Sequence, residues 1–241
     1  MSAQTDGAIK LDLTRMFIIP RVSLAYLSLF AAIYCNAVLQ PILSVHMDKT
    51  FPDLTGQTSK VFGALSFAYL LVGLFISVMP QRLDKRSYMV GGVFMYAIAA
   101  SLVGPLYITE MFQFPEYGDL VSVGVVLTGL GLGLIRIPST IEFIEATRDH
   151  TQSSSWKIND LAATLGGNAF GLASILGRVS GGFFADFIGY RRLWTGIVVM
   201  FLILLGLYIS FFREERSEKR TITEDTEMRD YETQSIPKSN K

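Results

Sequence analysis

Four long stretches of this chain contain no Asp, Glu, Lys or Arg. They are Val22–Met47, Val61–Gln81, Ser87–Thr109 and Leu193–Phe212. About 20 apolar residues in an α-helix, rising ~1.5 Å each, cross the hydrocarbon core of a membrane. A helix at the surface of a water-soluble protein would carry a charged face that interrupts such a run. The stretches therefore predict four transmembrane helices.

Two further apolar runs are each interrupted by one arginine. Leu120–Ile135 continues past Arg136, and Leu161–Gly177 continues past Arg178 to Ala185. Counting both, we predict an all-α integral membrane protein with six transmembrane helices.

The charged residues divide the chain into three parts. Of the 42 charged residues, 15 lie in residues 213–241 and four in residues 1–20. We predict a cytosolic segment over 1–20, a six-helix bundle over 21–212 and a disordered cytosolic tail over 213–241. The net charge of zero argues against a nucleic-acid partner. With one cysteine and two histidines, we expect neither a metal site nor a cofactor.

Lys and Arg in the flanks of the helices predict the orientation. One side carries twelve of them: Lys10, Arg15, Arg21, Arg82, Lys85, Arg86, Arg148, Lys157, Arg213, Arg216, Lys219 and Arg220. The other side carries three: Lys49, Arg191 and Arg192. We therefore place both termini in the cytosol, in a multi-pass protein of the plasma membrane or of a vesicle or endosomal membrane.

Glycines four residues apart expose one face of a helix to close approach by another helix. Such pairs are Gly129/Gly133, Gly167/Gly171 and Gly177/Gly181. The pairs have two interpretations: tight static packing, or smooth faces on which helices can rock. The spacing does not decide between the two.

Five polar residues in the spans are candidates for lining a solute pathway, since polar groups in a membrane are costly unless they face the bundle interior or water. They are Asn36, Gln40, Tyr69, Asn168 and Arg136. The alternative for the uncharged four is hydrogen bonding between helices. Counted from Leu120, Arg136 falls near the cytosolic end of the core, where it could also extend to the lipid headgroups.

No phosphate-binding loop, HExxH motif or acid pair on one helix face is present in the spans, so we do not expect an enzyme. No Asp, Glu or His falls in the middle third of any predicted span. If the chain worked by proton exchange, it would therefore not carry the titratable group that such exchange needs.

Two motifs resemble the last three helices of major facilitator superfamily transporters. They are Gly129-Leu-Gly-Leu-Gly-Leu-Ile-Arg-Ile-Pro138 and Leu176-Gly-Arg-Val-Ser-Gly-Gly-Phe-Phe-Ala-Asp-Phe-Ile-Gly-Tyr-Arg191. Phe51-Pro-Asp-Leu-Thr55 is most similar to the vesicular amine/polyamine transporter branch of that superfamily. The resemblance covers roughly residues 15–212.

The resemblance implies one half of a fold that normally has twelve helices in two six-helix halves around a midplane site. This chain would be the C-terminal half, and its partner a second six-helix half or a copy of itself. Asp186, Gly189 and Arg191 look like the superfamily's cytosolic gating loop, although the charge count places them on the opposite side. Arg178 stands where the family's antiporter signature has proline, and the acidic residues of monoamine carriers have no counterpart.

Two functions follow as expectations. The first is a carrier in the lipid bilayer that moves a small organic solute by alternating access. The second is a non-transporting subunit, or pseudo-transporter, that kept the fold and assembles with a partner membrane protein.

Overall fold

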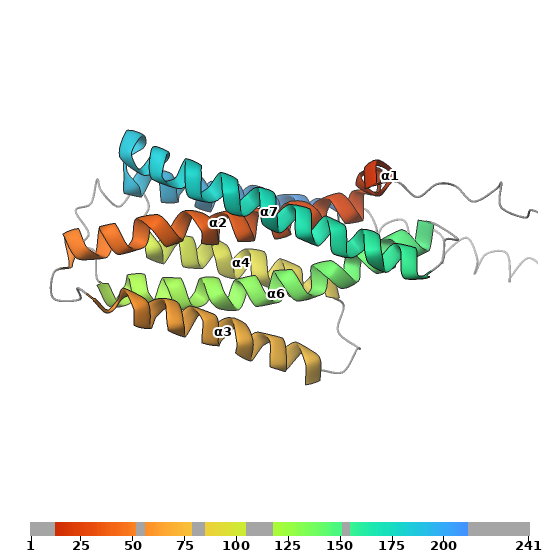
Figure 1. Cartoon of the computed structure of the whole chain (residues 1–241), viewed down its shortest axis with the longest axis horizontal. Coiled ribbons are helices and arrows are strands. Elements are labelled where there is room, and N and C mark those ends of the chain that lie inside the picture. Colours follow the sequence, from red (N-terminus) through yellow and green to blue (C-terminus); the bar gives the residue numbers. More distant parts are fainter. Residues whose placement is uncertain (1–12, 52–55, 79–84, 105–117, 151–154, 212–241) are drawn as a thin grey trace, which may run out of the picture. The chain divides into compact units, whose positions relative to one another are not determined.

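A computed structural model describes residues 13–51, 56–78, 85–104, 118–150 and 155–211, and all its regular elements in these ranges are α-helices (Figure 1). Six of them are long and apolar enough to cross a membrane. These are α2 (Pro20–Thr50), α3 (Thr58–Val78), α4 (Lys85–Val103), α6 (Gly118–His150), α7 (Ser155–Ile188) and the final helix Tyr190–Phe211. The prediction of a six-helix membrane bundle is confirmed.

The observed helices differ from the apolar runs mainly at their ends. A short helix, α1 (Leu13–Ile18), lies within the predicted N-terminal segment. It is followed by Ile19, whose backbone is extended. Pro20 explains the break, because proline disfavours a helical conformation in the residue before it. The predicted tail, 213–241, lies outside the described residues.

The chain divides into two units, Met1–Leu204 and Leu205–Lys241. In the second unit, the described residues 205–211 are helical. In the first, α4 packs along α6 and α2 packs along α7, while α3 covers another side of α6 (Figure 1).

Glycines on α6 allow this close packing against α3. A Cβ added to Gly129 would lie 2.3 Å from the carbonyl oxygen of Leu65, and one added to Gly133 would lie 2.7 Å from Val72 Cγ1. Both distances are shorter than a carbon atom tolerates, so any side chain here would separate the two helices.

One glycine pair of α7, Gly177 and Gly181, faces α2. A Cβ added to Gly177 would lie 2.7 Å from Ala37 Cβ, which is too close for two carbon atoms. A Cβ added to Gly181 would lie 3.1 Å from Val38 Cα, so the contact one turn farther along is tight but less severe. The closest approach of α7 to α2 along this pair is therefore at Gly177, while Gly181 continues the same packed face.

The other glycine pair of α7 differs from the expectation. A Cβ added to Gly167 or Gly171 would meet no atom within 4 Å. The expected packing role is therefore not seen for Gly167 and Gly171 among the described residues, because no other helix comes within contact distance of either glycine.

Ion pairs gather at one end of the bundle, which we call the Arg21 end. Arg21 begins α2, Arg86 begins α4, and Glu142 lies in the last turns of α6. Glu142 Oε1 accepts hydrogen bonds from Arg21 Nε at 3.0 Å and from Arg86 Nε at 3.1 Å. A carboxylate that is only 5% exposed thus ties three helices together.

The opposite end, which we call the Gly189 end, contains the turn between α7 and the final helix. Gly189 has a φ of +88°, a conformation that favours glycine. The next residue, Tyr190, stacks on the His46 ring near the end of α2, and its hydroxyl donates a 2.8 Å hydrogen bond to the Val103 carbonyl at the end of α4. Among the described residues, Arg21, Lys85, Arg86, Arg148 and Lys157 flank the helices at the Arg21 end, and Lys49, Arg191 and Arg192 flank them at the Gly189 end. The cytosolic assignment remains a prediction.

Candidate functional site

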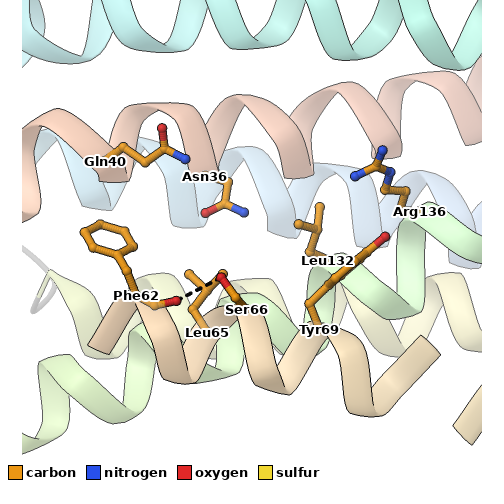
Figure 2. A pocket seen from close by; sticks show the side chains of 8 residues that line it. All are labelled: Asn36, Gln40, Phe62, Leu65, Ser66, Tyr69, Leu132 and Arg136. Atoms are coloured by element: carbon orange, nitrogen blue, oxygen red, sulfur yellow. Dashed lines mark hydrogen bonds between the residues drawn. The ribbon is translucent and has the colours of Figure 1, made fainter. Parts of the chain in front are cut away.

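A cavity of about 400 Å³ with several polar side chains in its wall lies between α2, α3 and α6 (Figure 2). Its lining consists of Asn36, Gln40, Phe62, Leu65, Ser66, Tyr69, Leu132 and Arg136. Four of the five predicted pathway residues, Asn36, Gln40, Tyr69 and Arg136, are thus brought together from three helices. Phe62, Leu65 and Leu132 form the apolar part of the wall and had no polar signal that could single them out.

Asn36 and Gln40 reach this cavity from α2 because residues four apart lie on the same helix face. Within the described ranges, the Asn36 carboxamide has no hydrogen-bond partner, and Figure 2 shows it directed toward α3. Gln40 Oε1 accepts a 3.2 Å hydrogen bond from Arg178 on α7, which leaves its amide group as a donor. Asn36 is therefore free to bind a solute, while Gln40 is partly committed to α7.

The α3 side supplies a serine and a tyrosine. Ser66 Oγ donates to the Phe62 carbonyl oxygen of its own helix at 3.0 Å, so its hydroxyl proton is already used. The Tyr69 ring extends from α3 toward Arg136, as Figure 2 shows. The phenol hydroxyl can serve as either donor or acceptor.

Arg136 lies midway along α6 rather than near its end. The helix continues through Pro138 to His150, so the midpoint of α6 lies much farther along the chain than the apolar run suggested. The Arg136 guanidinium carbon is 5.9 Å from the centroid of the Tyr69 ring and 5.4 Å from that of Phe170, both within cation–π range. In the structure the Arg136 side chain therefore lies against two aromatic rings of neighbouring helices.

A second cavity, of about 320 Å³, meets the first at Arg136. It lies among α2, α6 and α7, and its lining consists of Leu29, Ile33, Arg136, Thr140, Ala162, Ala163, Gly166, Gly167 and Phe170. Gly167 therefore borders a hollow instead of packing against a helix. Phe170 carried no polar signal in the sequence, although its position three residues after Gly167 places it on the same face of α7.

The remaining predicted residues lie elsewhere. Asn168 is exposed on α7 and lines neither cavity. Asp186, Gly189 and Arg191 lie around the turn at the Gly189 end, far along α7 from Phe170. Across the part of the chain that the structure describes, no three His, Cys, Asp or Glu side chains gather in a way that could hold a metal ion.

Comparison with known proteins gives the family. The sequence profile of the Major Facilitator Superfamily matches residues 23–238. The MFS-type transporter SLC18B1 of Rattus norvegicus is 23% identical over 98% of this chain, and the match covers 49% of that protein. For the MFS-type transporter SLC18B1 of Mus musculus, identity is 24%, over 90% of this chain and 48% of the relative.

The chain thus spans about half the length of these two relatives. Both matches agree with the predicted relationship to the vesicular amine/polyamine branch, and a family of transporters agrees with the expectation that the chain is not an enzyme. With six helices long and apolar enough to span a membrane and a profile match over most of its length, this chain belongs to the Major Facilitator Superfamily.

Proposed function

We propose that this chain is one half of a carrier that moves a small organic solute across a membrane by alternating access. The observation that carries the proposal is the cavity midway along α2, α3 and α6, where the polar side chains of Asn36, Tyr69 and Arg136 meet. Polar groups at such a depth are retained where they face a solute or a water-filled path. A volume of about 400 Å³ suits a small organic molecule.

The second half would come from another six-helix chain, from a segment of a longer protein, or from a copy of this chain. Two observations support a partner. The chain matches about half of each relative, and one face of α7 lies open around Gly167 and Gly171. That face carries large apolar side chains such as Leu172 and Ile175, which lipid or a second bundle must cover.

The coupling chemistry would lie in that second half. Among the described residues, neither cavity is lined by Asp, Glu or His, the groups that carry protons in carriers. The glycine contacts of α6 with α3 and of α7 with α2 give smooth surfaces for the small helix movements that alternating access requires.

Uptake into proteoliposomes tests this proposal directly. The chain is reconstituted alone and together with a co-expressed partner half, and a panel of radiolabelled small organic solutes is screened. A solute taken up by the wild type is then tried with Asn36→Leu and Tyr69→Ala. We expect both substitutions to lower uptake at least about tenfold, because each removes polar lining. Background uptake of all solutes with a partner present would refute the proposal.

The second candidate is a non-transporting subunit, and the open α7 face favours it. In that case Asn36→Ala and Gln40→Ala leave function unchanged, while Gly167→Leu prevents assembly with the partner. Gly177→Leu serves as the matched comparison, because Gly177 contacts α2 of the same chain. We expect Gly177→Leu to disrupt the fold and Gly167→Leu only the complex, with native mass spectrometry reporting the complex in each case.

Orientation is part of the same proposal. The twelve basic residues favour a cytosolic location for the flanks that carry them, and so for both termini. Single cysteines placed at Arg148 and Arg192, in a Cys35→Ala background, would be labelled by an impermeant reagent from opposite sides of sealed cells. Labelling of the Arg148 position in intact cells would reverse the assignment.

A further inference from the structure

We propose that Arg136 binds an anionic group of the solute, a carboxylate or a phosphate, so that this site takes organic anions. The inference rests on the proposed role of the cavity as a solute site, and it concerns the chemical class of that solute. It starts from the position of Arg136, whose side chain is exposed midway along α6 and borders both cavities.

Arg136 has no acidic partner among the residues that the structure describes. The nearest acid toward the end of its own helix is Glu142, six residues on, which lies ~9 Å farther along the axis and about 120° around it. Glu142 is already bound by Arg21 and Arg86. The guanidinium charge is thus left uncompensated, which is costly inside a membrane until an anion joins it.

Two aromatic rings hold the guanidinium in place without neutralising it. Tyr69 on α3 and Phe170 on α7 contact it from two helices. A guanidinium over aromatic faces keeps its N–H donors in its own plane, where a carboxylate or phosphate can accept two of them together. The ring contacts therefore position Arg136 as a fork for such a group.

The rest of the first cavity supplies donors and no negative charge. The unpartnered Asn36 carboxamide and the Tyr69 hydroxyl both face it, and its lining contains no carboxylate. A cationic amine would find no counter-ion in this cavity and would be repelled by Arg136. An acceptor-rich anion instead matches the donors present.

Binding of three matched probes tests the inference. The full chain is placed in nanodiscs of phosphatidylcholine, and equilibrium dialysis measures the dissociation constants of 1-naphthoate, 1-naphthamide and 1-naphthylmethylamine. We expect the acid to bind at least about tenfold more tightly than the amide or the amine, the range of a charge-assisted hydrogen bond. In Arg136→Gln, this preference is expected to disappear.

Two controls make the comparison specific. Arg136→Lys keeps the charge but loses the planar fork, and we expect an intermediate preference. Arg148→Gln makes the same substitution on the same helix, at an exposed position that lines neither cavity, and should keep the full preference. Nanodiscs containing phosphatidylglycerol distinguish a solute from a lipid phosphate. If the acid binds as tightly in these nanodiscs as in phosphatidylcholine, the result supports a solute site. If the anionic lipid displaces the acid from the wild type in an Arg136-dependent way, the result overturns the assignment of Arg136 to a solute.

The outcomes separate this inference from the transport proposal. Equal binding of acid and amide, or a preference for the acid that survives in Arg136→Gln, overturns the inference. The transport proposal then still stands for a neutral or cationic solute. An Arg136-dependent preference for the acid without any uptake supports the inference and counts against transport. Binding of none of the three probes counts against both.

Discussion

The Arg178 guanidinium on α7 donates a 3.2 Å hydrogen bond to the Gln40 carboxamide on α2. In the resemblance to the family's antiporter signature, Arg178 takes the place of a proline, a residue without a side-chain donor. In this chain the position joins two helices that already touch at Gly177 and Gly181. Gln40, a candidate for the pathway, thus also belongs to the α2–α7 interface.

A double-mutant cycle at Arg178 and Gln40 should reveal this coupling. We expect Gln40→Leu and Arg178→Met to lower the free energy of unfolding by about 0.6–1.7 kcal/mol each, the range for polar contacts between membrane helices. The double variant should lose less than the sum of the two, because each single change removes the same bond. Unfolding by denaturing detergent measures all three variants. Strict additivity would show that the hydrogen bond contributes nothing.

Gly129 and Gly167 provide a matched pair for testing helix packing. Gly129→Ala places a Cβ 2.3 Å from the Leu65 carbonyl oxygen and should destabilise the bundle by about 1–3 kcal/mol, since α3 must move away. Gly167→Ala meets nothing within 4 Å and should leave stability unchanged or slightly raised. Thermal unfolding in detergent compares the two. Equal unfolding temperatures for the two variants would contradict the close contact between α3 and α6.

Glu142 should be the most sensitive charged position at the Arg21 end. Glu142→Gln removes the carboxylate that two guanidinium groups share. Because the Glu142 side chain is only 5% exposed, the substitution should lower the free energy of unfolding by about 3–5 kcal/mol. The control is Glu145→Gln, which removes an ion pair to Lys85 from a side chain that is 42% exposed. That change should cost about 0–1 kcal/mol. The reverse ranking would mean that burial does not govern these pairs.

Tyr96 on α4 combines two contacts that substitution can separate. Its ring stacks on Phe201 with centroids 4.7 Å apart, and its hydroxyl donates a 3.1 Å hydrogen bond to the Ala32 carbonyl oxygen on α2. Tyr96→Phe keeps the stack and should cost about 1 kcal/mol, whereas Tyr96→Ala also empties buried volume and should cost about 3–5 kcal/mol. Detergent unfolding measures both. Similar losses for the two variants would show that the ring contributes little.

Much of the architecture could be predicted from the sequence. Long apolar runs without charge predict membrane helices regardless of packing, because a helix satisfies its own backbone hydrogen bonds in lipid. Helix ends were less accurate, since α6 continues through Pro138 to His150 where apolarity alone suggested an earlier end. Glycine spacing singled out the close contacts at Gly129 and Gly177 but could not tell them from the open face at Gly167.

For the site, the sequence alone determined which polar residues interrupt the apolar runs, because that follows from the count along each run. Asn36, Gln40 and Tyr69 were candidates on that ground. Only the tertiary structure decided which of them share a cavity, that Asn168 does not, and that Arg136 lies midway along α6 between Tyr69 and Phe170. The physical reason is that the position of a residue along an apolar run is a property of one helix, whereas the neighbours of a side chain depend on how several helices are rotated and packed against one another.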